Sequence, residues 1–506
     1  MPLKLIPLVK EGRMEYSEYR NFDAVGLAEL VARGDVSAAE LLAVAIGRAE
    51  HVNPQVNAIV QPMYEIAQKR AATELSGPFA GVPFLIKDLM QDYAGLPTTG
   101  GSRSLRGHVA PAHSAVVQRW LDAGLVIFGK TNTPEFGSKP VTEPAAAGPA
   151  RNPWNLGHTP GGSSGGAAAA VAAGIVPVAG ASDGGGSIRI PAACCGLFGL
   201  KPGRGLVPCG PHHAEYLLGA ATEGVISRSV RDTAAMLDVL TANPDRGGPY
   251  LSALPAEPYA HLVGRDPGRL RIGYLTSSPI GTSVGDEAVT AVENAVALLT
   301  GLDHEVEPVE LDIDGHQIAQ DFLLMWSVEL ATTIADIQRT TGARTRDIEL
   351  DSRLLAAAGR VVRAPEYTAA HLRWNTHTRA LAAFHERYDM LLTPSLARAP
   401  VRVGELETSR VTRLLGEFLL RVRLLGPFSR TKLWADQVTA NLATVPFAQL
   451  ANITGRPAMS VPLYRTPTGL PLGVQFVGGL GSEHTLLALA HQLEATQPWA
   501  DHQPPL

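Results

Sequence analysis

Short apolar runs alternate with helical stretches along this chain, and that alternation limits its fold more than any other feature. Four runs are typical of buried strands: Val82–Ile86, Leu125–Phe128, Val176–Val178 and Arg271–Leu275. Three stretches among and after them have helical periodicity: His113–Ala123, Ser229–Thr241 and Glu287–Thr300. Strands that are apolar throughout and alternate with helices are typical of a sheet covered on both faces. The sequence therefore predicts an α/β fold.

Capping signals predict two helices near the amino terminus. Asp23 precedes a periodic stretch that stops at Gly34, a residue suited to the end of a helix. Ser37 and Glu40 have the spacing of a capping box, in which each side chain bonds the backbone N–H of the other. We expect the helix that this box opens to end near Ala49.

The domain organisation is predicted from where the strand and helix pattern is interrupted. Residues 1–13 are expected to form a loosely attached extension. The best candidate boundary is the Pro- and Gly-rich stretch near 243–268, but the same pattern resumes after it. We therefore expect one large domain over residues 14–506, although length alone would favour about three.

Charge and cysteine content limit the partners and the compartment. The formal net charge is −5, which gives no electrostatic reason to expect a nucleic-acid or membrane partner. Cys194, Cys195 and Cys209 are too few for a disulfide framework in 506 residues. The first residues lack the features of a signal peptide, and no apolar run approaches the roughly 18 residues of a membrane span. We expect a cytoplasmic protein.

Residues 407–425 form an amphipathic stretch with arginines between its apolar positions. The apolar side chains recur at helical spacing: Val411, Leu414, Leu415, Phe418, Leu419, Val422 and Leu425. We expect an ordinary helix packed on the core, with a pocket lid or a subunit contact as the alternative.

Two glycine- and serine-rich loops and one lysine carry the chemistry. The first loop, Gly161–Gly166, contains Ser163 and precedes an alanine-rich helix. The second loop, at 182–191, places three glycines directly before Ser187 and a proline suited to the first position of a following helix at its end. Lys87 ends a strand-like apolar run.

These residue types match what cleavage of an amide requires: a hydroxyl nucleophile, a base and donors for the oxyanion. Because glycine tolerates unusual φ values, the glycines before Ser187 can turn successive N–H groups toward one point. At the end of an apolar strand, Lys87 would be poorly solvated, which lowers the pKa of its amine as a base requires.

The first loop also fits the G-x-S-x-G pattern of an α/β-hydrolase elbow, which would make Ser163 the nucleophile. That elbow needs a buried strand directly before it. Residues 151–160 form a loop rich in Pro, Asn and Gly instead. We therefore reject the elbow.

Seven motifs together resemble the amidase signature family, from near residue 24 to about residue 495. They are GVPFLIKDL (81–89), GKTNTPEFG (129–137), ARNPWNLG (150–157), PGGSSGG (160–166), SDGGGSIRIPAACCGLFGLKP (182–202), NITGRPAMSVP (452–462) and GLPLGVQFVG (469–478). Within the family the chain is most similar to bacterial amidases, 6-aminohexanoate cyclic dimer hydrolases and urethanases. The resemblance implies one α/β/α domain built on a large mixed sheet.

The resemblance also implies three catalytic roles. Lys87 would be the base and proton shuttle, and Ser187 the nucleophile that attacks the carbonyl. Ser163 would bridge them from a cis peptide bond that it forms with Gly162.

Supporting roles follow from the same resemblance. The backbone N–H groups of Gly184, Gly185, Gly186 and Ser187 would form the oxyanion hole. Charge-assisted hydrogen bonds of Asp183 and Arg189 would brace the nucleophile loop. Ser164 would also support the site without taking part in the proton relay.

One departure from the family bears on the substrate. Glutaminase subunits of the tRNA-dependent amidotransferase usually carry glutamine where this chain has Ile190. We expect an amidohydrolase without cofactor or metal, acting with water on small apolar or aryl amides as a monomer or homodimer. Carbamates (urethanes) and esters are further candidate substrates. The alternatives are the glutaminase-type subunit and a non-catalytic binding protein on the same scaffold.

Overall fold

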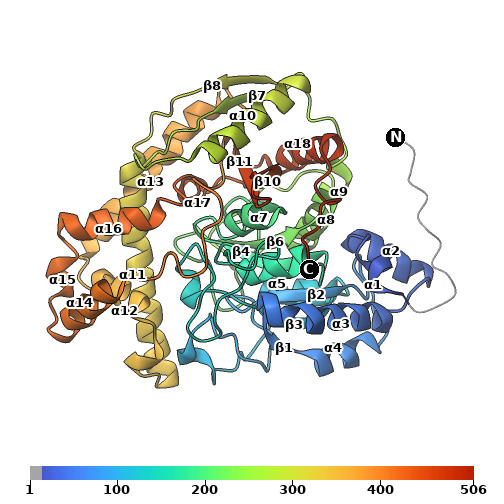
Figure 1. The fold of residues 1–506 in the computed structure, drawn as a ribbon, viewed down its shortest axis with the longest axis horizontal. Helices are drawn as coiled ribbons and strands as arrows, with labels where there is room; N and C mark the ends of the chain where they lie inside the picture. The colour runs from blue at the N-terminus through green and yellow to red at the C-terminus, as the bar shows by residue number, and fades with distance from the viewer. Residues whose placement is uncertain (1–13) are drawn as a thin grey trace.

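A mixed sheet of eleven strands runs through the molecule, as the computed structural model of residues 14–506 shows (Figure 1). The extension predicted at residues 1–13 lies outside the described residues. The strand order is β1-β3-β2-β4-β6-β5-β10-β11-β9-β7-β8. The strands are β1 (Ile59–Pro62), β2 (Pro83–Lys87), β3 (Val126–Thr131), β4 (Val178–Asp183), β5 (Phe198–Lys201), β6 (Thr222–Ser227), β7 (Arg271–Tyr274), β8 (Glu305–Pro308), β9 (Met390–Pro394), β10 (Ala458–Arg465) and β11 (Pro471–Gly478).

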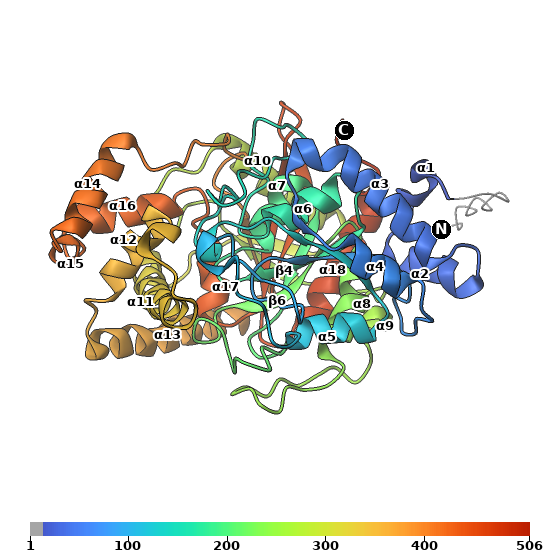
Figure 2. The same ribbon diagram turned by 90° about the horizontal axis from the view of Figure 1, so that it is seen from below.

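Helices cover both faces of this sheet, which confirms the predicted α/β class. They are α1 (Tyr16–Tyr19), α2 (Ala24–Arg33), α3 (Ala38–Val56), α4 (Tyr64–Ala71), α5 (Ala115–Asp122), α6 (Gly165–Ala172), α7 (Arg189–Cys195), α8 (Val230–Thr241), α9 (Tyr259–Leu262), α10 (Asp286–Gly301), α11 (Gly315–Thr341), α12 (Leu350–Gly359), α13 (Ala364–His385), α14 (Arg410–Arg421), α15 (Leu425–Phe428), α16 (Lys432–Leu442), α17 (Gln449–Ile453) and α18 (Glu483–Thr496). Helices α3, α6 and α7 pack on one face, and α5, α8 and α18 lie on the other (Figure 2).

Strand pairing brings the chemistry-bearing segments to the middle of the sheet. β2 lies between β3 and β4 and is parallel to both, so Lys87 and Asp183 end neighbouring strands at the same edge. β4 also pairs with β6 in antiparallel fashion, with Ser182 opposite Glu223. All five residues of β2 and all six of β4 are buried, as the apolar runs predicted for this part of the chain.

Most predicted elements are present, with shifted ends. The capping box of Ser37 and Glu40 opens α3, but this helix continues to Val56 instead of ending near Ala49, because its buried stripe continues through Val52. The strand expected at 176–178 begins at its last residue and runs on to 183, where β6 supplies its partner.

Helix α7 also begins earlier than expected. Pro191 is its third residue, not its first, because the helix starts at Arg189. Proline is tolerated there since the N–H groups of a helix's first turn have no acceptor within the helix.

The amphipathic stretch at 407–425 differs most from its prediction. It forms α14 and the start of α15, in a group of helices at the end of the molecule away from β1 to β4 (Figure 1). Gly416 is the only buried residue of α14. Val411 is 77% exposed and Phe418 58% exposed, so the interpretation as a helix packed on the core is wrong for this face.

Candidate active site

Lys87 lies fully buried at the end of β2, as its place after an apolar strand predicted. Its Nζ donates to Ser163 Oγ at 2.8 Å and to Ser182 Oγ at 3.0 Å. Burial lowers the pKa of Lys87 from its ordinary 10.5 to about 7, and the charges of Glu223 and Asp183 oppose that drop. A large fraction of this amine is therefore uncharged near neutral pH.

Ser163 lies in a tightly packed loop before α6. The peptide bond between Gly162 and Ser163 is cis, as the resemblance predicted. Thr142 Oγ1 donates to the carbonyl of Gly161 at 2.9 Å and so fixes the start of the loop. A Cβ added at Gly137 would lie 3.2 Å from Ser163 Oγ, so this serine is enclosed on that side.

Hydrogen bonds through Ser164 join the two serine loops. The N–H of Ser164 donates to the carbonyl of Ser187 at 3.3 Å. Ser164 Oγ donates to the carbonyl of Ser182 at 3.2 Å and accepts from the N–H of the same residue at 3.3 Å. The loop that carries Ser163 is therefore held against the loop that carries Ser187.

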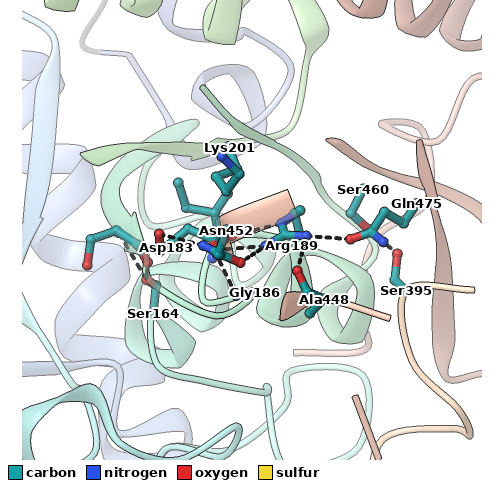
Figure 3. Close-up of polar contacts among 12 residues, drawn as sticks. Ser164, Asp183, Gly186, Arg189, Lys201, Ser395, Ala448, Asn452, Ser460 and Gln475 are labelled. Atoms are coloured by element: carbon teal, nitrogen blue, oxygen red, sulfur yellow. Dashed lines mark hydrogen bonds and ion pairs between the residues drawn. The ribbon is translucent and has the colours of Figure 1, made fainter. Parts of the chain in front are cut away.

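A buried ion pair between Asp183 and Arg189 braces the loop that carries Ser187 (Figure 3). Arg189 Nε and Nη2 donate to the two carboxylate oxygens at 2.9 and 3.0 Å. The same carboxylate accepts from the N–H groups of Gly186 at 2.7 Å and Ile188 at 3.2 Å. Burial alone would raise the pKa of Asp183, but the charge and hydrogen bonds of Arg189, together with the charge of Lys201 and the hydrogen bond from Asn452, hold that pKa well below its ordinary value.

The other donors of Arg189 bind elements far away in the sequence. Its Nη1 donates to the carbonyl of Ala448 at 3.0 Å and to Gln475 Oε1 at 2.6 Å, and its Nη2 donates to Asn452 Oδ1 at 2.6 Å. These contacts tie the loop to α17 and β11, as Figure 3 shows. The predicted bracing role of Asp183 and Arg189 fits this geometry.

The glycine run before Ser187 differs from its expected arrangement in one respect. The N–H of Gly186 already donates to Asp183, so it is engaged within the loop. Within residues 14–506, the N–H groups of Gly184, Gly185 and Ser187 have no such acceptor. The donors available for an oxyanion are therefore these three. Ser187 itself is buried, with 8% of its surface exposed.

Large apolar side chains lie directly against the glycine run, and sequence reasoning missed them. A Cβ at Gly185 would lie 2.6 Å from Phe322, and one at Gly184 would lie 2.9 Å from Leu217 and 3.3 Å from Trp326. Phe322 and Trp326 are one turn apart on α11, with ring centroids separated by 5.5 Å. Their i, i+4 spacing shows that they share a helix face but not what that face meets.

Between residues 14 and 506, no group of three or more His, Cys, Asp or Glu side chains is placed to hold a metal ion. None of the helices over the same range combines the length and apolar character that crossing a membrane requires.

Comparison with known proteins gives a consistent result. The family model described as Amidase matches residues 40–487. The 6-aminohexanoate-cyclic-dimer hydrolase of Pseudomonas sp. (strain NK87) is 38% identical over 496 residues, which cover 96% of each chain. A solved structure of a 6-aminohexanoate cyclic dimer hydrolase matches with a TM-score of 0.87 and 35% identity, over 96% of this chain and 99% of that one. A bacterial aryl acylamidase structure matches with a TM-score of 0.82 and 28% identity, over 95% of this chain and 98% of that one.

Proposed function

The chain belongs to the amidase family and is an amidohydrolase acting on amides; from this premise we propose that Ser187 attacks the substrate carbonyl, with Ser163 and Lys87 relaying the proton. The observation that carries the proposal is the buried hydrogen bond between Lys87 Nζ and Ser163 Oγ beside the nucleophile loop. A weakly basic, uncharged lysine amine in contact with a hydroxyl is the arrangement that general-base activation of a serine requires.

The proton moves in two linked steps. Uncharged Lys87 takes the proton of Ser163 while Ser163 takes that of Ser187, whose oxygen forms the new bond to the carbonyl carbon. In the structure Lys87 is hydrogen-bonded to Ser163, but the Ser163 and Ser187 hydroxyls are not hydrogen-bonded to each other. In this proposal that second bond forms when substrate enters, since catalytic hydrogen bonds often tighten only in the complex.

The tetrahedral intermediate is stabilised by backbone donors. The N–H groups of Gly184, Gly185 and Ser187 would hold the oxyanion, while Asp183 holds the loop through the N–H of Gly186. Return of the proton through Ser163 to the leaving nitrogen breaks the C–N bond, and water then hydrolyses the acyl-enzyme.

An apolar wall beside the nucleophile favours an apolar or aryl substrate. Phe322 and Trp326 face the glycine run, where contact with an aryl group would bury apolar surface worth about 25 cal/mol per Å². The relatives' names, an aryl acylamidase and a hydrolase of a cyclic amide, support this choice. We propose that anilides are the preferred class, with aryl carbamates and esters also cleaved.

The test is a comparison of kcat/KM for a nitroanilide, an aryl carbamate, an aryl ester, glutamine and acetamide under one set of conditions. We expect the aryl substrates to be cleaved faster than glutamine or acetamide. Trp326→Ala should lower kcat/KM for the nitroanilide by roughly tenfold, equivalent to about 1.4 kcal/mol, and change acetamide little. A clear preference of the wild-type protein for glutamine would reject the aryl proposal and favour the glutaminase-type alternative.

A further inference from the structure

A second buried ionisable group lies beside Lys87 and has no part in the proton relay. Glu223 on β6 is 2% exposed, and it lies opposite Ser182, the residue whose Oγ accepts from Lys87 Nζ. Glu223 Oε2 accepts from Gln91 Nε2 at 2.6 Å. Its other oxygen, Oε1, has no hydrogen-bond partner among the described residues.

Gln91 links this carboxyl to the end of β2. Its Oε1 accepts from the backbone N–H of Lys87 at 2.6 Å, and its Nε2 also donates to the carbonyl of Ala181 at 3.2 Å. The neutral side chain of Gln91 therefore bridges Glu223 and the backbone of Lys87 and fixes their relative positions. Ser182, which lies opposite Glu223 on β4, accepts from Lys87 Nζ.

A carboxylate with an unpartnered oxygen is costly to bury. Two protonation states lower that cost: a neutral carboxylic acid, or a carboxylate stabilised by the positive charge of protonated Lys87. The pair is therefore coupled, because the charge on either group changes the free energy of charging the other.

We propose that Glu223 is a positioning residue that sets the pH at which Lys87 becomes a free base. This inference rests on the proposed role of Lys87. Ionised Glu223 would favour the ammonium form of Lys87, whereas protonated Glu223 leaves the amine free to accept a proton from Ser163.

Burial brings the titrations of Lys87 and Glu223 close together. Burial raises the pKa of Glu223 to about 8, with the hydrogen bond from Gln91 and the charge of Lys87 opposing the rise. The pKa of Lys87 lies near 7, and Glu223 is the largest influence that raises it against burial. The two groups therefore titrate over the same pH range, and part of the Glu223 population is ionised while Lys87 loses its proton.

The other titratable groups that face this pair do not change charge in the same way. Burial raises the pKa of Cys209 to about 12 and raises that of Tyr216 well above its ordinary value, so both stay neutral. Asp183, which faces Lys87 from β4, is kept ionised by Arg189. The carboxyl of Asp92, half-buried in the loop after β2, adds a negative charge that raises the pKa of Glu223.

Glu223→Gln tests the proposal because it removes the charge while keeping the shape and an oxygen that can accept from Gln91. We expect the acid limb of the kcat/KM profile between pH 5 and 10 to move to lower pH by at least about half a unit, because the field that favours protonated Lys87 is gone. The plateau should fall a few-fold, since a lysine with a lower pKa is a weaker base.

Two further variants serve as a second test and a control. Glu223→Met removes the charge together with the acceptor of Gln91 Nε2, which keeps its hydrogen bond to the carbonyl of Ala181. It should shift the limb in the same direction even if the glutamine variant fails to fold. Glu494→Gln is the matched control: its pKa is also raised by burial, to about 7, but its carboxyl accepts from the N–H of Val230 in a different part of the fold. The acid limb of the kcat/KM profile of Glu494→Gln should lie at the wild-type pH.

The possible outcomes separate this inference from the proposed function. An unmoved limb in folded Glu223→Gln or Glu223→Met, together with an inactive Lys87→Ala, overturns the role of Glu223 alone. An active Lys87→Ala would reject the proposed relay itself, and with it the inference.

Discussion

The loop around Ser187 and helix α14 (Arg410–Arg421), called the arm below, differ in how deeply their side chains are buried. Asp183 and Arg189 are almost completely buried, and each of their polar groups has a partner on another element. On α14, Val411 and Phe418 are largely exposed although they are apolar. The loops that carry Ser163 and Ser187 are therefore fixed by many internal contacts, whereas the arm contributes exposed surface. Substitutions in the two regions should therefore differ in effect by orders of magnitude.

The largest effects are expected in the proton relay. Ser187→Ala and Lys87→Ala should each lower kcat by at least ~10³, because one removes the nucleophile and the other its base. Ser163→Ala should have an intermediate effect, since a water molecule can take part of the hydroxyl's role. Ser164→Ala is the matched control, because Ser164 lies in the same loop but outside the relay, and it should cost far less. Turnover near the wild-type rate by Ser187→Ala, measured free of host enzymes, would reject the assignment.

The next largest effect concerns the buried ion pair. Asp183→Asn leaves Arg189 buried with an uncompensated charge, so the free energy of unfolding should fall by roughly 3–5 kcal/mol. Denaturation in urea measures this change. Asp35→Asn breaks the exposed pair between Arg33 and Asp35 and serves as the control, with a change within about 0.5 kcal/mol. Similar values for the two variants would contradict the contrast between buried and exposed regions.

A smaller, graded effect is expected from pH. The pKa of Lys87 is lowered to about 7, so the free base is the minor form below that value and the major form above it. Activity should therefore rise with pH through the neutral range to an alkaline plateau, with about a tenfold loss per unit below pH 6. A rate that falls from acidic to neutral pH would contradict a lysine base.

The smallest effects are expected on the arm. Leu414→Gln and Phe418→Gln replace exposed apolar side chains, so kcat/KM should stay within about twofold of the wild-type value. The free energy of unfolding should change by no more than about 0.5 kcal/mol. A large loss in either quantity would show that this face is covered or borders the pocket, and the comparison would fail.

Local motifs allowed the three residues of the proposed relay to be chosen from the sequence. Lys87, Ser163 and Ser187 each lie in a short pattern whose residue types have a direct chemical reason, and the structure brings Lys87 and Ser163 into contact. The contact of Arg189 with Gln475, 286 residues further along, has no local signal. The engagement of the Gly186 N–H by Asp183 depends on the fold of the loop, which the glycine run alone does not specify.

Amphipathic periodicity explains the remaining errors. The pattern shows that a helix has an apolar side, but not whether that side has a partner. It therefore led to the wrong expectation for α14 and gave no indication that Phe322 and Trp326 of α11 face the nucleophile loop. Whether α14 has a packing partner, and what the face of α11 contacts, both depend on contacts between segments far apart in the chain.

The central claim, that Ser187 carries the acyl group, has one direct test. An aryl ester or anilide is mixed with the full-length protein, the reaction is stopped with acid within the first turnovers, and the digested peptides are analysed by mass spectrometry. We predict that the acyl mass is found on Ser187 and is absent from Ser187→Ala. An acyl group on Ser163 in the wild-type protein, or unchanged labelling in Ser187→Ala, would contradict the account.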